Sequence, residues 1–511
     1  MGKMREKGWG RMSATIQKNP VKTVLCFTVL CFGFWAVLFS LCPMTEDDRY
    51  FWSLGLRSLP EIRDFALRYG NGRLLGNLGV FYLVEYPLLR VLVKAGVLTG
   101  MTLLLPAVLG LCGSEYRLGS FLLLTLLSPS LFAQVYTWTS GFQNYVPPLF
   151  LLLLNLWLCR RSRGWALALP VLGLSFAMQL YVEHSSAIHV LMGLGLCLWA
   201  GKWDKKRLPC AGAFLLGAVL GLGLMLALPT RIAAPLVDMA TYKGLAFSGG
   251  PAAAVMAIGK NTVVVLAQFA DHAFLLAALS VLSLRLLRQQ GTWMSVRERR
   301  LISAALLPTA AVMLLSQTVS MGRWFGDVSL WESLGLALCM GLWLLGFLWT
   351  VLRLALREKQ RDWQLLAVFS LLAVLSVAPM LVLRPLVCRM GYHGYLVLCA
   401  AALWMLHLDC ALPRQPLRTG LCLLAAAAAL WLGVHFGDIH RMTEIREDYL
   451  AGQIAAGETQ MDYFMVPSEY VFDYFDPEVY GYYYHRRYSA EPELEAVPAD
   501  VWFNRHVYGV F

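Results

Sequence analysis

Charged residues are scarce in this sequence. Only 15% of its 511 residues are Asp, Glu, Lys or Arg, whereas 58% are hydrophobic, and soluble globular chains carry roughly 25% charged residues. The composition therefore excludes an ordinary soluble domain and indicates an integral membrane protein. The net charge of +11 does not indicate a nucleic-acid partner, because the basic residues lie in short clusters between apolar stretches, as membrane topology requires.

Metal-binding and nucleotide-binding motifs are missing as well. The twelve cysteines are scattered, with no C-x-x-C pair and no Cys/His ligand spacing, so we interpret them as small buried hydrophobic residues. No G-x-S-x-G, P-loop or dinucleotide fingerprint stands in a usable setting. We expect no nucleotide cofactor and no dedicated metal site. Whether a divalent cation, Mg or Mn, bridges a carboxylate to a phosphate is left open.

The first apolar run lacks a signal-peptide cleavage site. Six Lys and Arg residues precede the run 23–42, which has roughly the 20 residues of a spanning helix and exceeds the ~7–15 residues of a signal-peptide core. No A-x-A sequence follows it. The pattern predicts an uncleaved signal anchor with a cytoplasmic N-terminus.

Long apolar runs dominate what the sequence does contain. They predict an all-α polytopic protein with about thirteen spans. The expected spans are 23–42, 90–112, 118–135, 145–159, 165–182, 187–200, 208–228, 263–287, 301–320, 330–352, 363–383, 392–408 and 417–436. The segments expected in the cytoplasm hold 25 of the 43 Lys and Arg residues but only 7 of the 32 acids, as the positive-inside rule requires. An odd number of spans places the C-terminus outside.

Three regions on the expected outer face are too long to be simple turns, namely 43–89, 229–262 and 437–511. Long loops on one face are a common place for function. We therefore divide the chain into a transmembrane domain, 1–436, and a small extracytoplasmic C-terminal domain, 437–511. Apolar residues recur at near-helical spacing between Phe51 and Leu67, which predicts short interfacial helices in the first outer loop.

An acidic pair, Asp47 and Asp48, directly follows the first expected span. Adjacent carboxylates at a membrane boundary repel each other and are costly to desolvate, so one of them can keep a raised pKa and accept a proton near neutral pH. The alternative is a solvated acidic cap on a helix end. The same loop later contains an N-G-R-x-L-G-N element at 71–77.

A first span, an acidic pair, interfacial helices and a second span together resemble the GT-C class of membrane glycosyltransferases. The resemblance is nearest to a bacterial branch whose first loop combines a D-D-aromatic start with an N-G-R-x-L-G-N element. It covers the whole chain in layout but few positions in sequence. It implies a GT-C-like bundle in a bacterial plasma membrane. It also implies sugar transfer from a polyprenyl-phosphate carrier to an extracytoplasmic glycan or cell-envelope acceptor, as in polysaccharide biosynthesis.

The resemblance also implies roles for individual residues. A catalytic base would be Asp47, with Asp48 as the second choice. The carrier phosphate would be bound by Arg389, Arg384 and Arg73, for which snorkelling to lipid headgroups is the alternative. Substrate-binding candidates are Asn71, Asn77, Glu183, Trp138 and Asn144, the last two in an aromatic and amide-rich turn that also fits an interfacial belt.

Two features depart from the family pattern or leave a choice. Arg49 follows the acidic pair where an uncharged residue is expected, and an ion pair with Asp47 or Asp48 would lower that carboxylate's pKa. The C-terminal segment is short, and its aromatic stretch 467–488 fits either a sugar-stacking surface or the core of a very small domain.

Another functional class remains open. A transporter or flippase of lipid-linked or small polar substrates would favour broken helices, a polar path at the midplane and internal symmetry. Asp271 and His272, inside the eighth expected span, are the hint of such a path, and no internal repeat is evident. An O-antigen polymerase or ligase and a non-catalytic scaffold are further alternatives.

Overall fold

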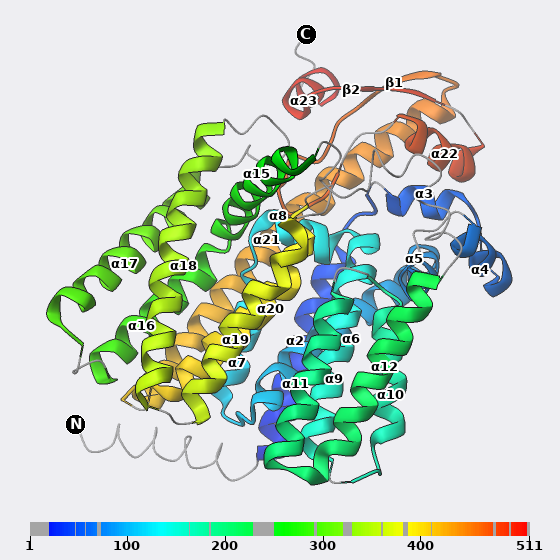
Figure 1. The fold of residues 1–511 in the computed structure, drawn as a ribbon. Helices are drawn as coiled ribbons and strands as arrows, with labels where there is room; N and C mark the ends of the chain where they lie inside the picture. The colour runs from blue at the N-terminus through cyan, green and yellow to red at the C-terminus, as the bar shows by residue number, and fades with distance from the viewer. Residues whose placement is uncertain are drawn as a thin grey trace, which may run out of the picture.

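The computed structural model describes residues 20–45, 47–56, 58–68, 73–162, 164–182, 185–227, 250–290, 294–319, 330–358, 361–381, 387–409, 411–473, 477–489 and 492–507. Within these residues the chain is a bundle of long helices with one short parallel pair of strands (Figure 1).

The α-helices of the first half are α2 (Pro20–Ser40), α3 (Asp47–Ser53), α4 (Leu59–Arg68), α5 (Leu74–Glu85), α6 (Pro87–Leu109), α7 (Ser114–Thr125), α8 (Pro129–Phe132), α9 (Thr139–Arg161), α10 (Ala168–Gln179), α11 (Ser186–Trp203) and α12 (Leu208–Ala227). A π-helix, η1 (Ala133–Thr137), joins α8 to α9, and a 3-10 turn, η2 (Lys205–Arg207), precedes α12.

The second half contains α15 (Gly250–Ala270), α16 (Ala273–Gln290), α17 (Val296–Val319), α18 (Leu330–Glu358), α19 (Arg361–Val377), η4 (Ala378–Leu381), η5 (Cys388–Gly391), α20 (Tyr392–Leu408), α21 (Arg414–Ala455), β1 (Gln460–Tyr463), α22 (Pro477–Tyr488), β2 (Glu493–Ala496) and α23 (Ala499–His506).

The chain is a multi-pass, all-α membrane protein. Among the described residues, nine helices are long and apolar enough to cross a bilayer, and the pair α7 and α8–η1, bent by 87°, would make a tenth. The expected number of thirteen is not confirmed. Three of the expected spans overlap α10, α11 and α17, which are outside this set.

The prediction of the eighth span as one continuous helix was wrong. The run 263–287 is not one helix, because α15 ends at Ala270 and α16 begins at Ala273, with Asp271 and His272 at the break. Helix α15 also begins at Gly250, inside the region 229–262 that we expected to be an outer loop. Hydropathy cannot locate such a break, since apolar residues continue on both sides of it.

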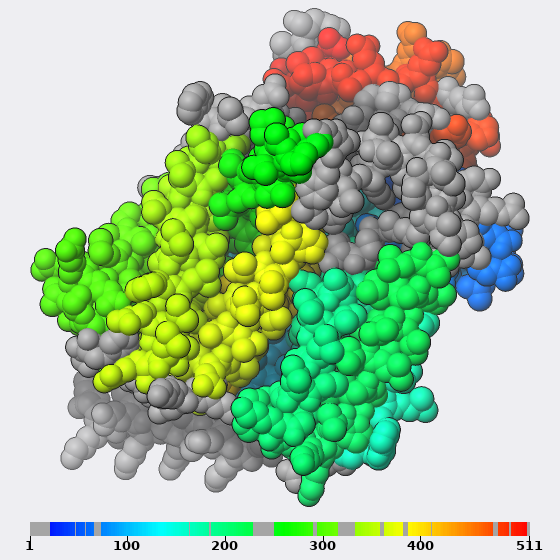
Figure 2. Space-filling model, in the orientation of Figure 1, coloured from blue at the N-terminus to red at the C-terminus, as the bar shows by residue number. Residues whose placement is uncertain are grey.

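The helices pack in two groups. In one group α10 packs on α9 and α12, and α11 packs on α12. In the other, α15 and α17 pack on α18, α19 packs on α20, and α16 packs on α17 and α20. Figure 2 shows the surface hollowed between the yellow helices α19 and α20 and the green helices α11 and α12, with blue side chains visible deeper inside.

Helix α21 runs through the expected domain boundary. Its 42 residues span about 63 Å at 1.5 Å per residue, whereas a bilayer core is roughly 30 Å thick. The boundary expected at 436/437 therefore lies inside a continuous helix. We call the C-terminal half of α21 together with β1, α22, β2 and α23 the cap, which lies beside α3 and α4 at one end of the bundle (Figure 1).

The cap has its own aromatic core. Strands β1 and β2 pair in parallel, with Met461 opposite Leu494. Tyr463, Tyr480 and Tyr484 are fully buried there and pack with Leu450. The aromatic stretch of the C-terminal segment thus supplies the large side chains that a very small core needs.

Candidate functional site

The candidate site surrounds the first turn of α9, at the cap end of the bundle. Asp48 is fully buried, and its Oδ2 accepts a hydrogen bond from the Thr139 backbone N–H at 2.8 Å. Its Oδ1 accepts from the Ser140 N–H at 2.9 Å and from the Ser140 Oγ at 3.0 Å. A helix start leaves unpaired N–H groups and a partial positive charge that favour a carboxylate. Asp48 is therefore the N-terminal cap of a distant helix.

This assignment separates the two acids of the pair. Both oxygens of Asp48 already accept hydrogen bonds from the first turn of α9. Asp47 is the first residue of α3 and is half-buried. Of the two predicted bases, Asp47 is the one whose carboxylate is not committed to capping α9.

A buried lysine completes the arrangement from the other side. Lys94 on α6 donates from its Nζ to the carbonyl oxygens of Tyr136 at 3.0 Å and Thr137 at 2.8 Å, the last two residues of η1. Lys94 and Asp48 thus hold the peptide groups before and after Trp138. Lys94 was not among the predicted site residues, although an ionisable residue within an apolar span is a recognised functional signal.

Trp138 and Arg389 meet at this point. The Arg389 guanidinium lies 4.8 Å from the Trp138 ring centroid, and its Nη1 donates to Gln134 Oε1 at 3.2 Å. The Phe472 ring lies 5.0 Å from the same indole, which is buried. No ring face is exposed for a sugar to stack on, so contact of Trp138 with a substrate would run through its indole N–H.

The N-G-R-x-L-G-N element packs α5 onto α9. A Cβ at Gly76 would overlap the side-chain oxygen of Asn144, so the two helices approach closely there. The Leu75 N–H donates to the Leu180 carbonyl at 3.0 Å, which fastens the first turn of α5 to the end of α10. Arg73, just before α5, lies over the Tyr145 ring of α9 at 6.0 Å.

Seven of the ten predicted site residues lie on elements that meet at this end of the bundle. They are Asp47, Asp48, Arg73, Asn77, Trp138, Asn144 and Arg389. Asn71, Glu183 and Arg384 lie outside the described residues.

Several buried polar atoms here have no hydrogen-bond partner among the described residues. They are the Trp138 Nε1, the Gln143 Oε1, the Asn144 Oδ1 and both ring nitrogens of His393. An unsatisfied buried polar atom costs about 1–3 kcal/mol. Water or a ligand can supply the missing partners of such atoms.

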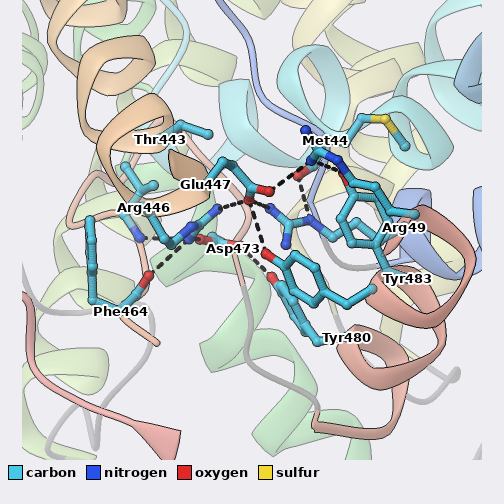
Figure 3. Close-up of polar contacts among 12 residues, drawn as sticks. Met44, Arg49, Thr443, Arg446, Glu447, Phe464, Asp473, Tyr480 and Tyr483 are labelled. Atoms are coloured by element: carbon cyan, nitrogen blue, oxygen red, sulfur yellow. Dashed lines mark hydrogen bonds and ion pairs between the residues drawn. The ribbon is translucent and has the colours of Figure 1, made fainter. Parts of the chain in front are cut away.

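Arg49 links the acidic pair to the cap. Its Nη2 lies 3.2 Å from Glu447 Oε1 on α21, and its guanidinium lies 4.5 Å from the Tyr480 ring centroid and 4.9 Å from that of Tyr483 (Figure 3). Sequence analysis considered a local ion pair with Asp47 or Asp48. Arg49 instead pairs with Glu447, which only the tertiary fold brings near.

A second buried ion pair continues this network. Arg446 Nη1 donates to Asp473 Oδ2 at 2.9 Å, and Asp473 also accepts from the Val466 N–H and the Tyr480 hydroxyl (Figure 3). Burial alone would raise the pKa of Asp473, but the positive charges of Arg446 and Arg49 outweigh it and hold that pKa below its ordinary value. The network, which we call the cap cluster, clamps α3 between α21 and α22.

No group of three or more His, Cys, Asp or Glu side chains arranged to hold a metal occurs among the described residues. Comparison of the chain with protein-family models, with curated proteins and with solved structures finds no match. Its function is therefore inferred from its residues and their arrangement.

Proposed function

We propose that this protein is a GT-C-type membrane glycosyltransferase that moves a sugar from a polyprenyl-phosphate carrier to an extracytoplasmic glycan or cell-envelope acceptor. One observation carries the proposal. The helix of the acidic pair and the turn of Arg389, far apart in the sequence, converge on the first turn of α9, where Trp138 contacts Arg389 and the next residue's N–H binds Asp48. The proposed proton acceptor and the proposed phosphate-binding cation are thus carried by elements that meet at one end of α9.

The chemistry assigns a separate task to each residue. Asp47 takes the proton of the acceptor hydroxyl, whose oxygen attacks the anomeric carbon of the donor sugar. The bond between that carbon and the carrier phosphate breaks, and the phosphate leaves with the electron pair. Arg389 neutralises the departing phosphate, since a guanidinium grips phosphate oxygens through two parallel N–H groups. Asp48 and Lys94 keep the α9 start in place.

The test is transfer of radiolabelled sugar from membrane-extracted polyprenyl-phosphate donors. Asp47→Asn should reduce transfer about 10²–10⁴-fold, the usual contribution of a general base, with an unchanged melting temperature. Asp64→Asn, which removes an exposed acid of the same loop, is the matched control and should be silent. Full transfer by Asp47→Asn would overturn the role of Asp47. Transfer with and without a chelator decides whether Mg or Mn assists.

A transporter or flippase is the second candidate, favoured by one observation. The break between α7 and α8 meets the break between α15 and α16, where Ser128 Oγ lies 3.3 Å from His272 Nδ1. Facing helix breaks are typical of transporter binding sites. Uptake of the labelled donor into proteoliposomes without covalent transfer would establish this class instead. Transfer without uptake would exclude it.

A further inference from the structure

Two buried histidines join the two helix groups at the cap end. His189 is the fourth residue of α11 and His393 is the second residue of α20, and their ring centroids lie 5.2 Å apart. Both side chains are buried. They bridge the helices that border the hollow in Figure 2.

Gln179, the last residue of α10, extends this pair. Its Oε1 lies 3.4 Å from His189 Nδ1, and its Nε2 donates to the Ser175 carbonyl at 3.3 Å. The amide oxygen is an acceptor, so His189 Nδ1 carries a proton in this contact. The cluster contains no acidic side chain and no Lys or Arg.

His393 is the incomplete member of the cluster. It is 3% exposed, and neither ring nitrogen has a hydrogen-bond partner among the described residues. A neutral imidazole offers one donor and one acceptor, and leaving both unused inside a protein costs about 1–3 kcal/mol per group. The partners that complete His393 therefore come from outside the described residues.

The cluster adjoins the proposed donor site. Arg389 lies four residues before His393, on the turn that leads into α20. Gln179 neighbours Leu180, whose carbonyl holds the first turn of α5. The phosphate-binding side chain and the uncharged cluster therefore reach into the bundle from the same end.

We propose that Gln179, His189 and His393 bind the hydroxyl groups of the donor's neutral sugar ring, an inference that rests on the proposed glycosyl transfer. A sugar hydroxyl is both a donor and an acceptor, and so is each neutral imidazole. A charged group would find no counter-charge among these three side chains. Arg389 holds the phosphate, and the cluster selects an uncharged sugar.

The test uses purified full-length protein in detergent and three probes. They are citronellyl phosphate, its conjugates with mannose, glucose or galactose, and the free hexoses. Melting temperature against probe concentration gives the affinities. At least one hexosyl conjugate should bind the wild type more tightly than citronellyl phosphate does. His393→Phe and His189→Phe should each weaken that conjugate at least about 10-fold, the cost of roughly one hydrogen bond, and leave citronellyl phosphate unchanged.

The control is His407→Phe, at the exposed far end of the same helix, which should alter neither affinity. His393→Asn keeps a donor and an acceptor, so it should still bind the hexosyl conjugate somewhat more tightly than citronellyl phosphate. This variant keeps the test available if His393→Phe fails to fold. If both Phe variants still favour the hexosyl conjugate over citronellyl phosphate by the same factor as the wild type, the inference is overturned. The glycosyltransferase proposal would still stand. If the histidine variants weaken the binding of free hexose but not that of the hexosyl conjugates, the cluster binds the acceptor sugar. That result would overturn the inference that it binds the donor. A wild type that binds none of the probes would overturn both proposals.

Discussion

Two buried polar regions lie at the same end of this molecule, and they differ in the kind of group they hold. The cap cluster holds charges in ion pairs, Arg49 with Glu447 and Arg446 with Asp473, although some guanidinium nitrogens of both arginines have no hydrogen-bond partner among the described residues. At the starts of α9 and α20, the uncharged side chains of Asn144 and His393 are buried with polar atoms that likewise have no partner among those residues. Breaking a buried ion pair destabilises the fold, whereas an uncharged polar group without a partner can bind a ligand.

The largest effect is expected from breaking an ion pair of the cap cluster. Arg446→Met removes the partner of Asp473 and leaves a buried carboxylate unpaired. Breaking a buried ion pair in this way costs about 3–5 kcal/mol of unfolding free energy. Thermal unfolding in detergent micelles measures it. Arg487→Met is the matched control, because Arg487 pairs with Glu447 at a partly exposed position, where about 0–1 kcal/mol is expected.

Acidification should act on the same pair. The pKa of Asp473 is lowered in the folded protein, so its stabilising contribution is complete above the ordinary pKa of 3.8 and is lost as the pH falls from there through the folded-state value. The melting temperature of the wild type should therefore drop more steeply below about pH 4 than that of Asp473→Asn. Parallel pH profiles for the two proteins would contradict this role.

An intermediate effect is expected at the join between η1 and α9. A Cβ at Gly141 would overlap the backbone carbonyl oxygen of Gln134, which no side-chain rotation can relieve. Gly141→Ala should cost about 1–3 kcal/mol, as overpacking does, and should shift Trp138. Gly33→Ala on α2 meets nothing within 4 Å and should be neutral or slightly stabilising. Equal unfolding curves for the two variants would refute the close contact.

The smallest effect is expected at the starts of α9 and α20 in the absence of ligand. His393→Phe replaces a buried imidazole that has no hydrogen-bond partner among the described residues by an apolar ring, a change that is nearly neutral or stabilising by less than about 1 kcal/mol. A loss of unfolding free energy comparable with that of Arg446→Met would show that the contacts of His393 stabilise the fold as much as the ion pairs of the cap cluster do. It would contradict the difference between the two regions.

The sequence predicted where most helices lie, because a helix that crosses the lipid needs an apolar run about as long as the bilayer core is thick. It did not predict the break at Asp271 and His272, where apolar residues continue on both sides. It also missed the partner of Arg49, since Glu447 lies 398 residues further along the chain and nothing local marks the pairing.

The candidate site was predicted in part for the same reason. Asp48 was recognised as an acid beside a span, with a helix cap as the alternative, but the helix that it caps begins 91 residues later. Lys94 carried a readable signal, a charge inside an apolar run. His393 carried none, because only the structure shows that its ring is buried with no hydrogen-bond partner among the described residues.

Two consecutive residues of α3 are fastened to different bodies. Asp48 holds α9 inside the bundle, and Arg49 holds the rod-like α21 far above its membrane segment. A rod about 63 Å long displaces its tip by about 10 Å for every 10° of tilt, and helix tilt follows the thickness of the surrounding bilayer. A change in acyl-chain length that tilts α21 would therefore act on α3, and so on Asp47, through the ion pair of Arg49 with Glu447.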